Sequence, residues 1–88
     1  MRYCINIKGR VQGVFFRKYV LEKANELGIF GYVENRSDGS VYCEAEGKGE
    51  FLELFIDWCG EGSPMSHVTS VEVEAKEPVH YSHFEIHM

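Results

Sequence analysis

The amino-acid sequence predicts a small α+β fold, in which an antiparallel sheet carries two helices on one face. Two observations lead to this prediction: several segments alternate apolar and polar residues as strands do, and two segments space their apolar residues as helices do. The chain has 88 residues, so we expect residues 1–88 to form a single domain. A composition of 44% hydrophobic and 26% charged residues is typical of globular proteins and excludes a disordered chain.

A strand followed by a helix is predicted for the first part of the chain. Residues 3–7 alternate apolar and polar side chains, which indicates a half-buried strand. The next apolar residues recur at steps of four, four and three, and therefore lie on one face of a helix. They are Phe16, Val20, Ala24 and Leu27. Gly28 stands where a C-terminal cap belongs, so the helix is expected to end there.

The middle of the chain predicts a β-hairpin and a second helix. Residues 29–36 and 40–47 are strand-like, and the Asp-Gly pair between them is a strong hairpin signal. The second helix is expected over residues 50–59, ending at Gly60. Four of its apolar side chains are predicted to be buried: Phe51, Leu54, Phe55 and Trp58.

Two further strands are predicted near the end of the chain, over residues 69–75 and, shorter, over residues 84–88. The order strand, helix, strand, strand, helix, strand is that of the ferredoxin-like βαββαβ sandwich. In that fold the second strand comes from across the sheet relative to the first. Because the fold hosts enzymes, RNA binders, metal carriers and regulatory modules, it does not name a function.

Charge and targeting signals narrow the range of partners and compartments. The net charge is −5, which disfavours nonspecific nucleic-acid binding, because phosphate neutralisation needs clustered Lys and Arg. The chain has no apolar run long enough for a membrane span, and its first residues lack the apolar region of a signal peptide. We therefore expect a cytoplasmic protein that binds neither nucleic acid nor membranes, and we expect a monomer.

The cysteines do not form a recognisable framework. Their count of three is odd, no C-x-x-C motif is present, and cytosolic disulfides are rare. The count alone leaves a disulfide between Cys4 and Cys43 open. Alternation, however, places Cys43 in phase with core residues and Cys4 on the opposite face of the sheet, where the two thiols cannot meet.

No metal site is predicted. His80, His83 and His87 cluster near the C-terminus, but they flank an alternating strand, and the pattern shows no carboxylate or Cys partner at ligand spacing. A solvated strand face is therefore favoured over a metal centre.

The segment from Gly9 to Arg17 joins the first strand to the first helix and is the most informative part of the sequence. Such a turn leaves several backbone N–H groups without partners at the positive end of a helix dipole, where phosphate or carboxylate binds. Gly13 gives the turn conformational freedom, and the planar guanidinium of Arg17 suits two phosphate oxygens. The alternative is a plain loop with two glycines and a surface arginine.

Asn35 ends the second predicted strand, just before the Asp-Gly turn. Its amide could accept one hydrogen bond and donate another, which suits the holding of a water molecule. Alternatively, Asn35 favours the turn through hydrogen bonds to its own backbone, which is common. The spacing of residues supports these two interpretations equally.

Two motifs give the chain a resemblance to the acylphosphatases, enzymes that hydrolyse the mixed anhydride of a carboxylic acid and phosphate. The first family signature, G-x-V-Q-G-V-x-F-R, is matched by Gly9, Val11, Gln12, Gly13, Val14, Phe16 and Arg17. The second is matched by Gly31, Tyr32, Asn35, Gly39, Val41 and Gly47. The resemblance continues through Trp58, Pro64, Val68 and Val71 to Phe84 and Ile86. It thus covers nearly the whole chain.

The resemblance implies a role for each matched residue. Arg17 would bind the phosphate and Asn35 would position the attacking water. The phosphate cradle would consist of loop backbone amides, those of Gln12, Gly13, Val14, Phe15 and Phe16. The resemblance implies no cofactor and no metal, because an acyl phosphate leaves as a weakly basic carboxylate and the reaction needs mainly positioning. The substrate is expected to be a small acyl phosphate, with inorganic phosphate as product and inhibitor.

Three residues depart from the family pattern. Glu34 stands where the family often has a basic or neutral residue, and alternation points it away from the phosphate. Arg36 stands where the family commonly has a threonine, and this exchange bears on how the side chain of Asn35 is held. Tyr32 stands where the family frequently has a tryptophan, which is a conservative aromatic exchange. We expect these three exchanges to affect the catalytic rate and the substrate preference but not the class of reaction.

Two other functions are compatible with the fold. A noncatalytic module could use the same cradle to sense phosphate or an acyl phosphate. An RNA-binding module is disfavoured by the acidic charge and by the third strand, Val41-Tyr42-Cys43-Glu44-Ala45, which lacks the basic and aromatic run of such modules.

Overall fold

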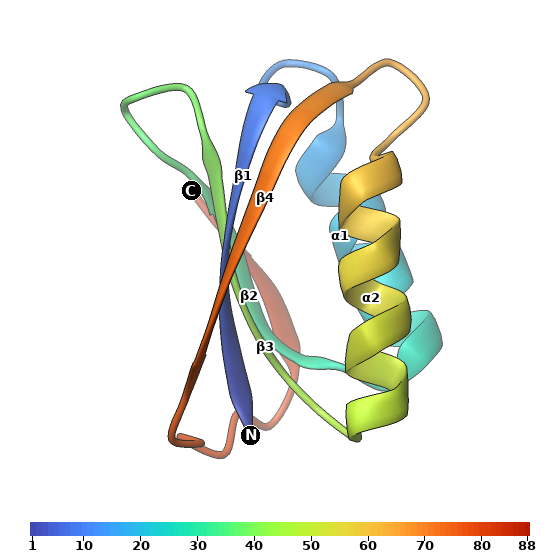
Figure 1. Cartoon of the computed structure of the whole chain (residues 1–88), viewed down its shortest axis with the longest axis vertical. Helices are drawn as coiled ribbons and strands as arrows, with labels where there is room; N and C mark the ends of the chain where they lie inside the picture. The colour runs from blue at the N-terminus through green and yellow to red at the C-terminus, as the bar shows by residue number, and fades with distance from the viewer.

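A five-stranded sheet forms one layer of the protein and two helices form the other, in a computed structural model that describes residues 1–88 (Figure 1). The strand order is β4-β1-β3-β2-β5, and all neighbours are antiparallel except β2 and β5. The elements are β1 (Arg2–Arg10), α1 (Phe16–Leu27), β2 (Phe30–Asn35), β3 (Val41–Glu46), α2 (Gly49–Glu61), β4 (His67–Lys76) and β5 (Phe84–His87). The predicted ferredoxin-like order is confirmed, because β3 separates β1 from β2.

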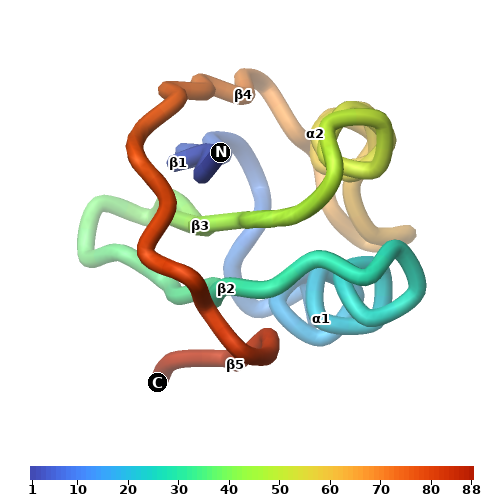
Figure 2. Tube along the Cα trace, turned by 90° about the horizontal axis from the view of Figure 1, so that it is seen from below, coloured from blue at the N-terminus to red at the C-terminus, as the bar shows by residue number.

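The core lies between the sheet and the two helices, which cover the same face (Figure 2). Ile5 and Ile7 of β1 pair with Cys43 and Val41 of β3, and all four side chains are fully buried. Helix α1 packs on β2 and β5, and α2 packs on β4. Full burial of an aliphatic side chain contributes about 1.5–3 kcal/mol, so each of the three aliphatic residues in this central patch, Ile5, Ile7 and Val41, contributes substantially to stability.

Helix α2 differs from the prediction in its end and in its buried face. The helix continues through Gly60 to Glu61, and the cap is Gly62, whose φ of 79° ends the helix while its N–H bonds to the Trp58 carbonyl at 2.8 Å. Leu54 is 53% exposed, whereas Leu52 is buried. The buried row is Leu52, Phe55 and Cys59. These residues share one face at steps of three and four, and Leu54 points away from that face.

The cysteines lie as the strand alternation predicts. Cys4 pairs with Glu44 and Cys43 pairs with Ile5, so the two thiols point to opposite faces of the sheet. All three cysteines are free and buried. Burial raises the pKa of the Cys59 thiol to about 12 and raises the pKa of Cys43 well above its usual value. The two core thiols therefore stay neutral and unreactive at physiological pH.

A buried carboxylate, Glu44, organises the face of the sheet that the helices leave uncovered. It accepts hydrogen bonds from the hydroxyl groups of Tyr42 and Tyr81, both at 2.6 Å, and from that of Tyr32 at 3.3 Å. The guanidinium of Arg2 completes the cluster at 2.7 Å. With four donors directed at it, the carboxylate is favoured in its charged form despite burial.

The segment that connects β4 to β5 is held by a second carboxylate of β3. Glu46 accepts hydrogen bonds from the backbone N–H groups of Val79, His80 and Tyr81. This connection crosses the end of the sheet at which the chain begins (Figure 2). Through Tyr81, the connection is also tied to Glu44. The two carboxylates therefore fix the path by which the chain reaches β5.

We expect stability to fall in acid largely through Glu44. Desolvation opposes its ionisation, but the bonds from Tyr42, Tyr81 and Arg2 outweigh this effect and lower the pKa of Glu44 from 4.5 to about 2. A depressed pKa adds stability above pH 4.5 that is lost as the pH falls towards 2, here up to about 3 kcal/mol. Chemical denaturation at pH 7 and pH 3 should show a larger loss for the wild type than for Glu44→Gln, and equal losses would contradict this assignment.

Candidate active site

The loop between β1 and α1 presents a row of unpaired backbone donors. No N–H group from Gln12 to Phe16 donates to a backbone carbonyl or to a side chain, and no side chain caps α1. The positive end of the helix dipole adds to these donors, so the loop favours an anion. A Cβ added to Gly13 would meet no protein atom within 4 Å, so the space beside that glycine is open.

Two residues of the loop have left-handed backbone conformations, Gly13 with φ 74° and Phe15 with φ 60°. Together they turn the chain sharply, so that Val14 and Phe16 are buried while Phe15 between them is exposed. Glycine adopts this conformation freely, but for phenylalanine it costs on the order of 1–2 kcal/mol. The surrounding packing must maintain this turn, because the local preference of Phe15 opposes it.

The side chain of Gln12 fixes the loop to the β2–β3 hairpin. Its Nε2 donates to the carbonyls of Arg36 at 2.7 Å and Ser40 at 2.8 Å. The hairpin turn is itself closed by the bond from the Arg36 N–H to the Ser40 carbonyl and by the Asp38 carboxylate, which accepts from the N–H and the hydroxyl of Ser40. The loop and the hairpin therefore form one rigid unit at one end of the sheet (Figure 1).

Ser63 supports the loop from the opposite side. This buried residue of the α2–β4 connection donates its hydroxyl hydrogen bond to the Val14 carbonyl at 3.3 Å. The carbonyl of Ser63 in turn accepts from the Ser66 hydroxyl at 2.7 Å. The sequence pattern does not identify Ser63. Its partner is 49 residues away in the chain, and no local pattern identifies such a contact.

Arg17 lies in the first turn of α1, directly after the loop, and is half-buried. Its Nη1 donates to the His87 carbonyl of β5 at 3.2 Å, which holds the guanidinium between the helix and the end of the chain. A guanidinium has five N–H donors. Apart from a weak contact with the Met88 sulfur at 4.0 Å, the other donors bind no group of the protein and are available to an anion.

Asn35 is the last residue of β2 and pairs with Val41, so it shares the sheet face that carries the helices. It is exposed, and its side chain makes no hydrogen bond within the chain. The hairpin turn is closed by Asp38 and Ser40 instead. The interpretation of Asn35 as a turn-stabilising residue is therefore wrong, and its carboxamide is available to a ligand or to water.

The residues that depart from the family pattern point away from this loop. Arg36 forms an ion pair with Glu34 at 2.7 Å, and its guanidinium lies 4.0 Å above the ring of Tyr42 on the uncovered face of the sheet. Glu34 pairs with Tyr42 across the strands and lies on the same face. The prediction that strand alternation points Glu34 to the other face of the sheet is confirmed. The Arg36 guanidinium is likewise engaged with Glu34 and Tyr42.

The C-terminal histidines have a carboxylate partner that the sequence prediction overlooked. The Nε2 atoms of His83 and His87 lie 2.6 and 3.3 Å from the two carboxylate oxygens of Glu85, which stands between them in β5. The bond with His83, followed by that with His87, lowers the pKa of Glu85. No group of three or more His, Cys, Asp or Glu side chains is arranged to hold a metal ion.

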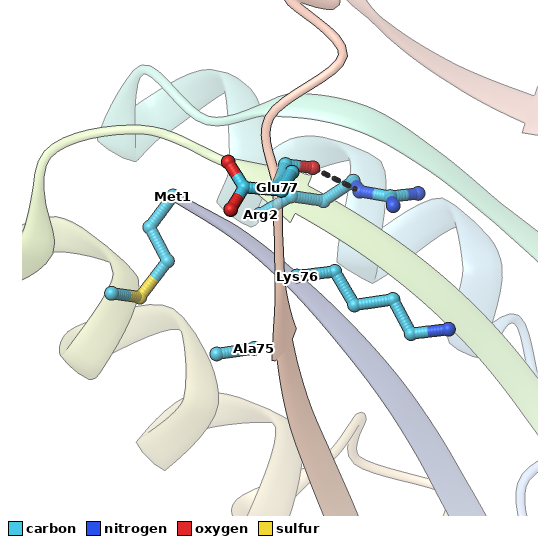
Figure 3. Close-up of a pocket in the computed structure, with 5 residues that line it drawn as sticks. All are labelled: Met1, Arg2, Ala75, Lys76 and Glu77. Carbon is cyan, nitrogen blue, oxygen red and sulfur yellow. Dashed lines mark hydrogen bonds between the residues drawn. The ribbon is translucent and has the colours of Figure 1, made fainter.

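The largest cavity of the molecule lies elsewhere. It has a volume of about 620 Å³. Five residues line it: Met1, Arg2, Ala75, Lys76 and Glu77 (Figure 3). Within this lining the Arg2 Nε donates a hydrogen bond to the Glu77 carbonyl at 3.0 Å. These residues belong to the end of the sheet where the chain begins, opposite the β1–α1 loop (Figure 1). The candidate site therefore rests on the unpaired donors of the loop and not on cavity size. Neither helix has the length and apolar character needed to cross a lipid bilayer.

Comparison with known proteins agrees with this geometry. The acylphosphatase family model matches residues 3–86. The chain belongs to the acylphosphatase family. An acylphosphatase of Shewanella amazonensis is 53% identical over 76 residues, which cover 86% of this chain and 84% of the relative.

Solved structures show the same relationship. The crystal structure of an acylphosphatase from Bacillus subtilis is 38% identical, with a TM-score of 0.95, and the match covers 99% of this chain and 98% of that one. Full-length HypF in its phosphate- and nucleotide-bound form is 34% identical with a TM-score of 0.92, but the match covers only 12% of that chain. This acylphosphatase is thus a hydrolase that acts on acyl phosphates.

Proposed function

We propose that the amides of residues 12–16, the guanidinium of Arg17 and the carboxamide of Asn35 form the active site of this acylphosphatase. The observation that carries the proposal is the row of unpaired N–H groups, which ends at an arginine with free donors. The Gln12 side chain supports it further, because it fixes this row to the hairpin that presents Asn35.

Phosphate binding follows from the geometry of the donors. The loop amides and the helix dipole direct partial positive charge at the phosphate oxygens, and the planar fork of Arg17 binds two of them. Because Gln12, Ser63 and the His87 carbonyl already hold these groups, little reorganisation is needed when charge shifts in the transition state. Preorganised donors of this kind supply most of the rate enhancement in such sites.

The hydrolysis itself needs few side chains. Asn35 accepts a hydrogen bond from a water molecule and directs its oxygen at the phosphorus, in line with the bond to the acyl oxygen. As that bond breaks, the acyl group leaves as a carboxylate, which is stable without protonation because its acid has a pKa near 4. The water proton passes to a phosphate oxygen of the substrate. The products are a carboxylate and inorganic phosphate.

We expect this activity to be independent of metal ions, because Arg17 and the loop amides supply the positive charge. Purified protein should release phosphate from benzoyl phosphate at the same rate with and without excess EDTA. Loss of activity with the chelator, restored by magnesium, would contradict the proposed chemistry. Phosphate binding without any turnover would instead identify the noncatalytic module that the cradle alone also permits.

We further propose that residues 1–88 act as one domain, as a monomer and in the cytoplasm. Continuous pairing across all five strands supports the single domain. The three buried free cysteines support a reducing compartment, where thiols persist.

A further inference from the structure

The peptide unit between Val14 and Phe15 is held in one orientation by a single contact. All peptide bonds of the chain are trans, so the Val14 carbonyl and the Phe15 N–H point in opposite directions within one plane. The carbonyl accepts a hydrogen bond from the Ser63 hydroxyl at 3.3 Å and has no other donor within the chain. Because Ser63 is buried, the Phe15 N–H points away from the protein interior, and it has no acceptor within the chain.

The backbone of Phe15 favours the opposite orientation of this peptide unit. Its φ of 60° lies in the left-handed region, which a phenylalanine adopts only at a cost. Rotation of the peptide plane by half a turn would bring φ to about −120°, a negative value typical of L-residues. The same rotation would turn the Phe15 N–H inward and the Val14 carbonyl outward. This rotated form of the loop lacks one donor and presents a carbonyl oxygen, which repels an anion.

The connection between α2 and β4 that carries Ser63 is packed closely against the start of α1. Gly62, with φ 79°, has no room for a side chain, because an added Cβ would lie 3.0 Å from the Val68 side chain and 3.3 Å from the Phe16 ring. The Phe16 ring also packs on Trp58 of α2, with ring centroids 5.7 Å apart. The position of Ser63 relative to the loop is therefore fixed by packing, and its hydroxyl can hold a strained peptide unit in place.

We infer that Ser63 is a positioning residue for phosphate binding: its hydroxyl keeps the Phe15 N–H facing the anion, against the backbone preference of Phe15. The inference rests on the proposed active site. The net free energy of one hydrogen bond and the cost of one left-handed residue are of similar size, so loss of the hydroxyl is enough to populate the rotated form. Bound phosphate or substrate selects the form with the outward N–H. The apparent affinity therefore falls with the population of that form, whereas the bound enzyme reacts normally.

Ser63→Ala should raise KM for benzoyl phosphate and the inhibition constant of inorganic phosphate by the same factor, about five- to tenfold, while kcat stays within about twofold. Ser66→Ala is the matched control, because it removes a hydroxyl hydrogen bond from the same connection without reaching the loop. The Ser66 N–H still donates to the Ser63 carbonyl at 3.0 Å, so the connection stays closed. This control should leave all three constants unchanged.

Solution NMR of the free proteins tests the backbone directly. The three-bond coupling between the amide proton and the Hα of Phe15 depends on φ and is larger near about −120° than at 60°. It should increase in Ser63→Ala and stay unchanged in Ser66→Ala. An unchanged coupling in Ser63→Ala, a loss confined to kcat, or the same loss of phosphate inhibition in both variants would each overturn the inference. If the wild type neither hydrolysed benzoyl phosphate nor bound inorganic phosphate, the proposed active site itself would fail.

Discussion

Replacing Arg17 with alanine is expected to reduce kcat/KM for an acyl phosphate by about 10³-fold or more. In the proposed active site Arg17 contacts the phosphate both in the bound substrate and in the transition state, so both KM and kcat should deteriorate, and inorganic phosphate should inhibit more weakly. Arg17→Lys should recover little of this loss, because an ammonium group cannot reproduce the planar fork that also bonds to the His87 carbonyl. Steady-state kinetics with benzoyl phosphate provides the measurement.

Lys18→Ala is the matched control for this prediction. It removes one positive charge from the same turn of α1, but Lys18 is exposed and forms no ion pair or hydrogen bond. If activity falls in Arg17→Ala but not in Lys18→Ala, the loss is due to the position of the Arg17 guanidinium and not to the change in the net charge of the protein. Unfolding must be followed alongside, since the variant also loses the bond to β5. Near-normal kinetics in a folded Arg17→Ala protein would exclude Arg17 from phosphate binding.

Much of the fold could be predicted because its signals are local. The apolar spacing and Gly28 predict the two ends of α1 as the structure has them, and the Asp-Gly pair predicts the hairpin between β2 and β3. Helix α2 was mispredicted because the pattern was centred on Leu54 although Leu52 lies on the buried face. Two competing glycines, Gly60 and Gly62, each look like a cap, and only backbone conformation distinguishes them.

The parts of the site that could not be predicted depend on long-range contacts. The Gln12 side chain bonds to carbonyls 24 and 28 residues away, and Ser63 bonds to one 49 residues away. No sequence pattern specifies which side chain will reach a given backbone carbonyl. For Asn35 the local pattern supported a turn role and a water-binding role equally. The tertiary structure removes the first, because Asp38 and Ser40 already close the turn, and the water-binding role stays a prediction.

Asn35→Ala should affect the chemistry alone. In the proposed mechanism its amide acts on the water and not on the phosphate, so kcat should fall by about 10²–10³, equivalent to roughly 3–4 kcal/mol, while inhibition by inorganic phosphate should stay almost unchanged. The side chain makes no hydrogen bond within the chain, so the free energy of unfolding should change by less than about 0.5 kcal/mol. Kinetics and denaturation of the same preparation test both statements.

Asn25→Ala supplies the comparison, because Asn25 is also an exposed asparagine but is located in the last turn of α1, away from the loop. It should retain normal kcat and normal inhibition by phosphate. The contrast with Arg17→Ala is the decisive feature: one variant weakens phosphate binding and the other does not. If Asn35→Ala lost phosphate affinity as severely as Arg17→Ala, the amide would have to contact the phosphate itself, and the attacking water would need another residue to orient it.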